Sequence, residues 1–246
     1  MTDLHTGMAA PFAVNPDCVA TVIYVGADKE PVLIIDDLLL DPEALVRYAE
    51  LGAPFRKEEK DFYPGIRKLL SMDYAQAIHD HLQQVFLDTF SGGRPASIVP
   101  LSSLLSVTST AEEDLRPIQS VPHFDSFDPT QIAGVHYLCP ATFGGTAFYR
   151  HRSTGFESMN AARLAQYAPQ LKREVMDLKA TSFRYIRGDT TLFERTACVE
   201  AKFNRAIYYR SNILHSGDMA ADVVLPPDPR TGRLTANTLA LVRPRD

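Results

Sequence analysis

Three residues of the sequence, His123, Asp125 and His215, have side chains that can bind one metal ion together. His123 and Asp125 are separated by one residue, and side chains i and i+2 of a β-strand point to the same side. One strand would therefore direct an imidazole and a carboxylate toward the same point. His215 lies far along the chain at the end of another apolar stretch, and it is the candidate third ligand.

Two imidazoles and one carboxylate on one face of an octahedron form the ligand set typical of non-haem Fe(II) oxygenases. The opposite face stays open for a co-substrate and O₂. A divalent ion with one carboxylate ligand keeps a net positive charge, which favours an anionic chelating ligand. The His-x-Asp pattern alone is weak, because a buried histidine is more often structural than metal-binding.

Arg233 strengthens the hypothesis, because it begins a stretch that alternates like a strand. Arg233, Thr235 and Asn237 would share one face, and Leu234 and Ala236 the other. A guanidinium group binds a carboxylate through two parallel hydrogen bonds, and Thr235 can add a hydroxyl. The alternative is an arginine paired on the surface, but three alternating polar residues predict a polar cavity on that face.

Together these residues resemble the 2-oxoglutarate and Fe(II)-dependent dioxygenases, in their prolyl-hydroxylase-like branch. The segment Gly144–Phe148 is similar to the Gly-Gly-x-Thr-x-Phe strand of that branch, and Leu33–Leu38 followed by Pro42 resembles its N-terminal opening. The motifs PHFDS, GGTAFYRHR and LHSG are similar to those of an uncharacterised bacterial subfamily. The resemblance extends over about residues 31–242.

The resemblance implies a double-stranded β-helix with the metal at its mouth. It implies that His123, Asp125 and His215 hold Fe(II), and that Arg233 binds the distal carboxylate of 2-oxoglutarate with help from Thr235 and Asn237. The expected reaction couples decarboxylation of 2-oxoglutarate to succinate and CO₂ with hydroxylation or desaturation of a small molecule, amino acid or peptide. Halogenating members lack the carboxylate ligand, so the presence of Asp125 disfavours halogenation.

Two features depart from the pattern of this family. Eighteen positions separate His215 from Arg233, against about ten in typical members, and a proline-rich loop over 220–232 would absorb the difference. The tyrosine that often precedes the first ligand by three residues is replaced by Ser120. Its hydrogen bond would come from Gln119, Tyr137 or Asn212, and the sequence does not choose between them.

Two other functions use the same residues. A cupin-like isomerase or hydrolase would bind the metal without 2-oxoglutarate, and a degenerate barrel would bind a ligand without catalysis. Other polar clusters have structural explanations: His136 is expected to be a core histidine, and the turn from Tyr63 to Arg67 contacts either substrate or the core. No phosphate loop, nucleophile elbow or zinc-finger spacing is present.

The elements that must position these residues change in type along the chain. A buried strand is expected at 31–36, with helices from Asp41 and over 73–90. Short strands then follow, as in an antiparallel sandwich or barrel: 101–107, 132–138, 145–149, 192–199, 206–209 and 234–242. A helical insertion over 157–179, broken near Pro169, is a candidate flap or buttress. We expect one domain over 1–246, with an N-terminal strand and helix layer at 1–97 and a β core at 98–246.

Composition sets the remaining limits. The chain has 246 residues, 45% hydrophobic and 22% charged, with a net charge of −5, which is ordinary for a soluble globular protein and disfavours nucleic-acid binding. Residues 1–122 are acidic and residues 123–246 basic, so an anionic ligand is expected in the second half. With three scattered cysteines, no signal-peptide pattern and no long apolar run, a cytoplasmic location without membrane contact is expected. The oligomeric state is not predicted.

Overall fold

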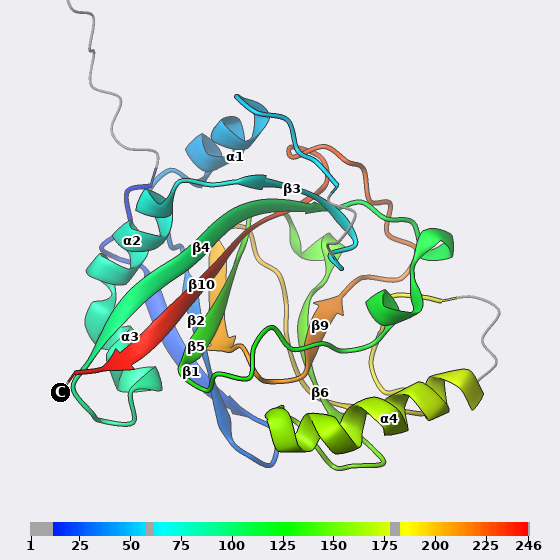
Figure 1. Cartoon of the computed structure of the whole chain (residues 1–246). Helices are drawn as coiled ribbons and strands as arrows, with labels where there is room; N and C mark the ends of the chain where they lie inside the picture. The colour runs from blue at the N-terminus through cyan, green and yellow to red at the C-terminus, as the bar shows by residue number, and fades with distance from the viewer. Residues whose placement is uncertain (1–11, 58–61, 178–182, 246) are drawn as a thin grey trace, which may run out of the picture.

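A computed structural model describes residues 12–57, 62–177 and 183–245, and its main feature is a pair of antiparallel sheets (Figure 1). The large sheet has seven strands in the order β1-β2-β8-β5-β10-β4-β3. These strands are β1 (Val19–Val25), β2 (Glu30–Asp36), β8 (Arg205–Arg210), β5 (Gln131–Tyr137), β10 (Arg233–Pro244), β4 (Ala96–Thr108) and β3 (Gly65–Leu69). The small sheet has the order β7-β6-β9, with β7 (Phe193–Val199), β6 (Gly145–His151) and β9 (His215–Asp218).

Two facing antiparallel sheets, in which most neighbouring strands are not consecutive in the sequence, form the jelly-roll arrangement, so the expected fold class is confirmed. All six strands expected after residue 98 are present with boundaries shifted by a few residues. Strand β10 shows the period-two pattern that the sequence predicts. Leu234 and Ala236 lie in the core on one side, whereas Arg233, Thr235 and Asn237 line a pocket on the other.

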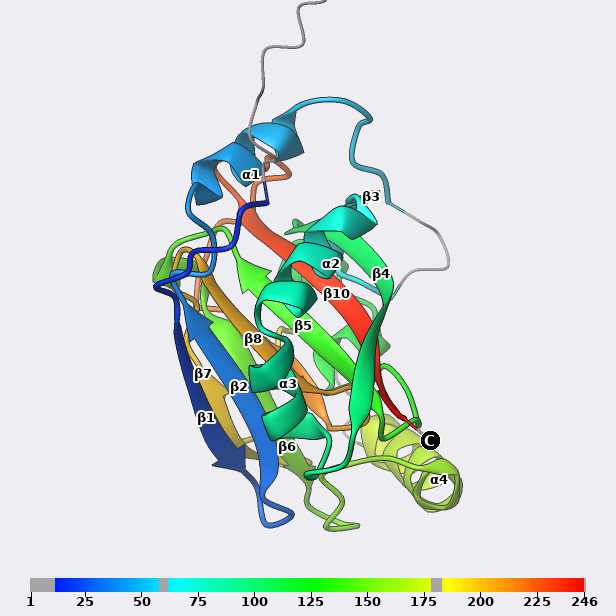
Figure 2. The same ribbon diagram turned by 90° about the vertical axis from the view of Figure 1, so that its left-hand side faces the viewer.

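Helices α1 (Pro42–Glu50), α2 (Met72–His81) and α3 (Gln83–Phe90) belong to the N-terminal layer, and α2 and α3 cross the outer face of the large sheet (Figure 2). Asp41 caps α1 by accepting a hydrogen bond from the amide of Ala44 at 3.0 Å. The helix expected over 73–90 is divided at Leu82, whose φ of −107° and ψ of 19° are not helical. Both pieces still bury one apolar face against the sheet.

The N-terminal segment also supplies strands that the sequence analysis missed. Besides the expected β2, it contributes β1 and β3, which form the two edges of the large sheet. The segment is therefore part of the sheet as well as a helical layer over it. Three short 3₁₀ helices, Glu112–Asp114, Pro117–Ser120 and Ala141–Phe143, complete the regular structure of the described residues.

Helix α4 (Ala161–Asp177) occupies the expected insertion and lies beside the small sheet (Figure 1). Pro169 stands inside this helix without dividing it, so the predicted break is wrong. Positions 178 and 179 of the predicted insertion lie outside the described residues. His151 of β6 contacts Glu174 of α4 at 2.8 Å, which fixes the helix to the sheet. None of the described helices has the length and apolar character needed to cross a membrane.

Candidate metal centre

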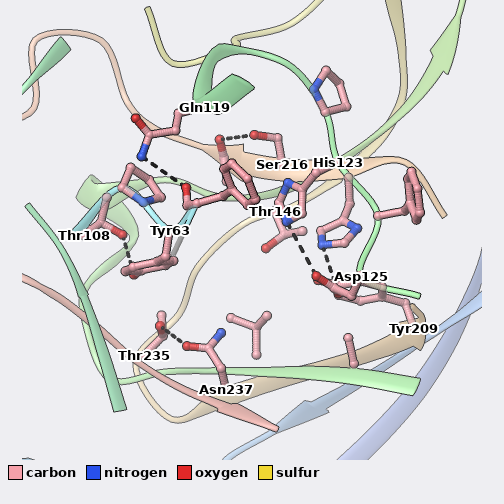
Figure 3. Close-up of a pocket in the computed structure, with 18 of the residues that line it drawn as sticks. Tyr63, Thr108, Gln119, His123, Asp125, Thr146, Tyr209, Ser216, Thr235 and Asn237 are labelled. Atoms are coloured by element: carbon pink, nitrogen blue, oxygen red, sulfur yellow. Dashed lines mark hydrogen bonds and ion pairs between the residues drawn. The ribbon is translucent and has the colours of Figure 1, made fainter. Parts of the chain in front are cut away.

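The two sheets enclose a pocket of about 590 Å³, which lies in the size range of small-molecule sites (Figure 3). Its wall includes residues from both sheets and from the segment that joins β4 to β5. The expected ligands His123, Asp125 and His215 all line it. Thr235 and Asn237 lie together on a different wall from Asp125 (Figure 3).

The three expected metal ligands converge at one point of this pocket. One ligand atom from each of His123, Asp125 and His215 lies within 4.8 Å of the others. The two carboxylate oxygens of Asp125 face different histidines, at 3.8 Å from Nε2 of His123 and 3.6 Å from Nε2 of His215. His123 and Asp125, together with His215, which lies 90 positions after Asp125 in the sequence, therefore form a donor set suited to a divalent transition metal.

The segment that holds His123 and Asp125 is extended, but it is not the regular strand that the sequence analysis expected. It pairs with the segment from Ser211 to His215 through isolated backbone hydrogen bonds. His123 and His215 exchange both backbone hydrogen bonds, at 2.9 and 2.8 Å, and the amide of Asp125 donates to the carbonyl of Ser211 at 2.7 Å. These bonds set the two ligand segments side by side, so the i, i+2 orientation survives without a longer ladder.

The hydrogen bond of His215 leaves one of its ring nitrogens available to a metal. Its Nδ1 lies 2.9 Å from the carbonyl oxygen of Ile213, which can only accept, so Nδ1 carries the proton and Nε2 keeps its lone pair. Such a second contact is the usual way to orient a metal-binding imidazole. The ring of Tyr209 packs against His215 at 4.7 Å between centroids.

His123 lines the pocket, and 53% of its side-chain surface is exposed. Although part of the ring is exposed, the protein packed around its inner side partly desolvates it and, with the neighbouring His215 and Arg67, lowers the pKa of His123 to about 4. Asp125 opposes this shift. The imidazole is therefore neutral near pH 7, the protonation state that a metal ligand requires.

Arg233 is a cation buried in the pocket wall, with 5% of its surface exposed. Its Nη2 donates to the carbonyl of Gly145 at 2.9 Å, and Nη1 lies 3.4 Å from the hydroxyl of Thr108. Nε has no partner, and no carboxylate of the described residues forms an ion pair with this guanidinium. A buried charge without a counter-ion is costly, so the pocket favours an anionic ligand here.

Thr235 and Asn237 stand on the same face of β10 as Arg233, as the alternation predicts. The hydroxyl of Thr235 donates to the amide oxygen of Asn237 at 2.9 Å. Thr235 is 1% exposed, so this contact satisfies a hydroxyl that has little access to water. Both residues are placed to contact a ligand bound near Arg233.

The two remaining candidates differ in position. Tyr137 does not line the pocket, but the guanidinium carbon of Arg233 lies 5.8 Å from the centre of its ring, and its hydroxyl bonds to Thr146 at 2.7 Å. The ring of Tyr137 therefore packs against Arg233 from outside the pocket lining. Asn212 also lies outside the lining, with its side-chain amide 3.4 Å from the carbonyl of Met159. Three residues were candidates for the hydrogen bond of the tyrosine that is absent at position 120. Of these, Gln119 lines the pocket.

The pocket also contains residues that the sequence left between two roles or did not assign to the site. Arg67 reaches the pocket from β3, Tyr63 from the turn before β3, and Tyr185 from the segment after α4. The hydroxyls of Tyr63 and Thr108 lie 2.8 Å apart, which links Tyr63 to the group that contacts Arg233. The sequence leaves the Tyr63–Arg67 turn between substrate and core, because the side of the sheet that it occupies depends on the pairing of β3 with β4.

The comparisons with known proteins give a family and several similar folds. Residues 16–240 match the model of a group described as "Family of unknown function (DUF6445)". Comparison with curated proteins finds no match.

Among solved structures, the chain is similar to the non-haem α-ketoglutarate-dependent epimerase SnoN from nogalamycin biosynthesis, with 14% identity, a TM-score of 0.48, and coverage of 88% of this chain and 82% of SnoN. It is similar to iron-bound HygX from Streptomyces hygroscopicus, with 11% identity, a TM-score of 0.47 and coverage of 87% and 83%. It is also similar to an N-substituted L-amino acid dioxygenase from Burkholderia ambifaria, with 14% identity, a TM-score of 0.40 and coverage of 88% and 83%. Likenesses at this level assign no function to the chain.

Proposed function

Since the chain belongs to a family of unknown function, DUF6445, we propose its activity from the chemistry of the pocket: it is an Fe(II)- and 2-oxoglutarate-dependent oxygenase. The observation that supports this most strongly is a three-residue metal-ligand set in the same pocket as an unpaired buried arginine. His123, Asp125 and His215 supply the metal ligands, and Arg233 supplies the anion-binding group.

The residues present fit a divalent iron ion. Two nitrogen donors and one carboxylate are the facial set that leaves the other coordination positions open. The hydrogen bond from His215 to Ile213 fixes the tautomer that offers Nε2, and Asp125 is close to both imidazoles. When bound, the metal would supply O₂ activation coupled to the decarboxylation of 2-oxoglutarate.

The residues also fit 2-oxoglutarate, which has a carboxylate at each end. Arg233 would bind the distal carboxylate through its unpartnered Nε and the neighbouring nitrogen, in a buried place where a charge-assisted hydrogen bond is strong. Thr235 would reorient its hydroxyl from Asn237 to that carboxylate. Tyr137 would hold the guanidinium in position through its ring.

The chain's own part in the reaction is binding, orientation and exclusion of water. The aromatic and aliphatic wall of the pocket limits solvent access, and Tyr209 holds the ring of His215 at a fixed angle. Both effects would direct oxidation to the bound substrate, a small molecule, amino acid or peptide, by hydroxylation or desaturation. The location of the protein in the cytoplasm and its place in the prolyl-hydroxylase-like branch are part of the same proposal.

The second candidate function is a cupin-like isomerase or hydrolase that uses the metal without 2-oxoglutarate. The unpaired Arg233 disfavours it, because such an enzyme has no requirement for a buried cation beside the metal. Consumption of 2-oxoglutarate separates the two functions.

The test is an assay of succinate released by the protein supplied with Fe(II), 2-oxoglutarate and O₂. We expect succinate from the wild type and none from His215→Ala. His81→Ala, an exposed histidine on α2, is the control and should keep the wild-type rate. Failure of the wild type to consume 2-oxoglutarate, with or without a panel of small carboxylates, would contradict the proposal.

A further inference from the structure

A hydrogen bond between Thr235 and Asn237 occupies a group that the proposed reaction needs. The hydroxyl of Thr235 donates to the amide oxygen of Asn237 at 2.9 Å, and among the described residues this hydroxyl has no other hydrogen-bond partner. Thr235 is 1% exposed, so water has little access to it. A hydroxyl has one hydrogen to donate. Thr235 therefore cannot donate to Asn237 and to a carboxylate beside Arg233 at the same time.

The strand register places Asn237 between the anion-binding end of the pocket and the metal centre. On the inner face of β10, Asn237 follows Thr235 by one inward-facing position and precedes Leu239 by one. Through β5, Leu239 lies in register with Tyr209, whose ring packs against His215. A ligand that extends from Thr235 toward the metal ligands would therefore pass Asn237.

The neighbours of Asn237 leave its amide nitrogen available to a ligand. Asn237 is half-buried, and it is flanked by Leu104 of β4 and Val135 of β5, which line the pocket and have no polar side-chain atoms. Among the described residues its side-chain N–H groups have no hydrogen-bond partner, and Figure 3 shows the nitrogen turned away from Thr235. A polar group between apolar neighbours in a pocket is typical of one that orients a ligand.

Binding of 2-oxoglutarate would separate Thr235 from Asn237. The carboxylate beside Arg233 would accept the hydroxyl hydrogen of Thr235, because a charge-assisted hydrogen bond is stronger than one to a neutral amide. The amide oxygen of Asn237 would then lose its donor in a half-buried position, where an unsatisfied acceptor costs free energy. A donor on the primary substrate would replace the lost one, so each of the two ligands would strengthen the binding of the other.

We propose that Asn237 makes the binding of 2-oxoglutarate depend on the primary substrate, and that this substrate offers Asn237 an N–H or O–H donor. The inference rests on the proposed function, because it assigns 2-oxoglutarate to Arg233 and Thr235. In the free protein Asn237 holds the hydroxyl hydrogen of Thr235 and so lowers the affinity for 2-oxoglutarate. Asn237 is thus a positioning residue for the co-substrate and a specificity residue for the substrate.

The test is a double-mutant cycle on 2-oxoglutarate affinity, measured by calorimetry on the full chain with Mn(II). Asn237→Leu removes the acceptor and frees the Thr235 hydroxyl for the carboxylate, so we expect binding about two- to tenfold tighter, the range of one neutral hydrogen bond. Thr235→Val should weaken binding. In the Thr235→Val background, Asn237→Leu should change the affinity by less than about twofold, because no hydroxyl remains to be released.

Two controls separate this effect from damage to the fold. Asn237→Ala should act as Asn237→Leu does without added apolar volume, and an affinity for Mn(II) within about twofold of the wild type shows that the pocket is intact. Ser102→Ala is the matched control, because Ser102 also lines the pocket but pairs with Leu239 instead of Asn237. It should leave the affinity for 2-oxoglutarate unchanged.

The donor on the substrate is tested with acetamide, which has N–H donors, and N,N-dimethylacetamide, which has the same carbonyl acceptor and no donor. In large molar excess, acetamide should tighten 2-oxoglutarate binding to the wild type about twofold or more. It should have no effect on Asn237→Leu. N,N-dimethylacetamide should leave the affinity of both proteins unchanged.

Equal effects of Asn237→Leu in the two backgrounds would overturn the inference, because Asn237 would then not act through Thr235. Weaker binding to Asn237→Leu would overturn it too, since Asn237 would then contact 2-oxoglutarate directly. Equal effects of the two amides on the wild type would overturn the assignment of a donor to the substrate. Failure of the proposed function has a different signature, because 2-oxoglutarate would then not bind to the wild type with Mn(II) at all.

Discussion

His136 and His215 are both buried histidines of the sheets, but they differ in how many ring nitrogens the protein satisfies. His136 of β5 faces the helical layer, where Nδ1 lies 2.8 Å from the hydroxyl of Tyr74 and Nε2 lies 3.2 Å from the amide oxygen of Asn204. His215 of β9 faces the pocket, and among the described residues only its Nδ1 has a hydrogen-bond partner. One imidazole is fully used by the fold, whereas the other keeps a donor atom for a ligand.

The network around His136 fixes its proton as firmly as the carbonyl of Ile213 fixes that of His215. The amide oxygen of Asn204 also accepts a hydrogen bond from the amide of Leu39 at 3.0 Å, so it acts as an acceptor and Nε2 of His136 donates to it. Tyr74 then donates to Nδ1. Burial lowers the pKa of His136 to about 4, which keeps it neutral. Counting satisfied ring nitrogens thus separates a structural histidine from a candidate metal ligand.

The largest expected effect is in the pocket that His215 faces, where Asp125→Ala should abolish most of the activity. Removing the carboxylate takes away one of three metal ligands and the group facing both imidazoles. Loss of an outer partner of a metal ligand alone costs about 10–100-fold, so we expect a fall in succinate formation beyond about 100-fold.

Asp128→Ala is the matched control for Asp125→Ala. Asp128 lies in the same segment and bonds to Thr130, but it does not line the pocket. A similar loss in both variants would mean that the segment, and not the ligand atom, is required.

Arg233→Gln should weaken 2-oxoglutarate binding by about 10–100-fold, because it removes charge-assisted hydrogen bonds in a buried place. The rate at saturating 2-oxoglutarate should change much less. Initial rates over a range of 2-oxoglutarate concentrations give both values. Arg243→Gln, an exposed arginine of the same strand, should match the wild type, and an unchanged KM in Arg233→Gln would remove 2-oxoglutarate from this position.

For His136, which faces the helical layer, the comparison predicts an effect on folding stability without an effect on metal affinity. His136→Gln should reduce the free energy of unfolding by about 1–3 kcal/mol, because Tyr74 and Asn204 lose a buried partner. Metal affinity should stay within about twofold, since the two sites share no side chain. Urea unfolding and metal titration check the two parts, and a loss of metal affinity equal to that of Asp125→Ala would make the comparison wrong.

A smaller effect of His136 should be seen in how much stability the fold loses in acid. His136 and His79 have pKa values lowered by burial to about 4, below the ordinary value of 6.5. Between these two pH values the unfolded chain binds more protons than the folded one, so stability falls as the pH falls from about 6.5 to about 4. His136→Gln removes one such contribution, so its unfolding free energy should change less than that of the wild type between pH 7 and pH 5. Equal changes would show that His136 does not titrate this way.

The sequence predicted which three side chains converge better than it predicted the segment that holds two of them. His123, Asp125 and His215 are recognisable because their chemistry depends on residue type and short spacing, and the period-two pattern placed Arg233 and Thr235 on one face. The regular strand expected around His123 is wrong, because single backbone contacts to Ser211 and His215 hold the segment.

Other features depend on contacts distant in the sequence and could not be derived from local patterns. Strand β1 is exposed along most of its length, so its residues lack the alternation of a half-buried strand. The sheet face occupied by Arg67 depends on the pairing of β3 with β4, and that register has no local signal. Asn212 was a candidate for the hydrogen bond of the tyrosine absent at position 120, but its side-chain amide contacts the carbonyl of Met159.

The most direct test of the central claim is anaerobic titration of the protein with Fe(II) in the presence of 2-oxoglutarate, followed by the visible charge-transfer absorption of the chelate. The account predicts an absorption band that saturates at one Fe(II) per chain in the wild type and in His136→Gln, and that is absent in Asp125→Ala. A wild-type protein without the band, or an Asp125→Ala protein that keeps it, would contradict the account.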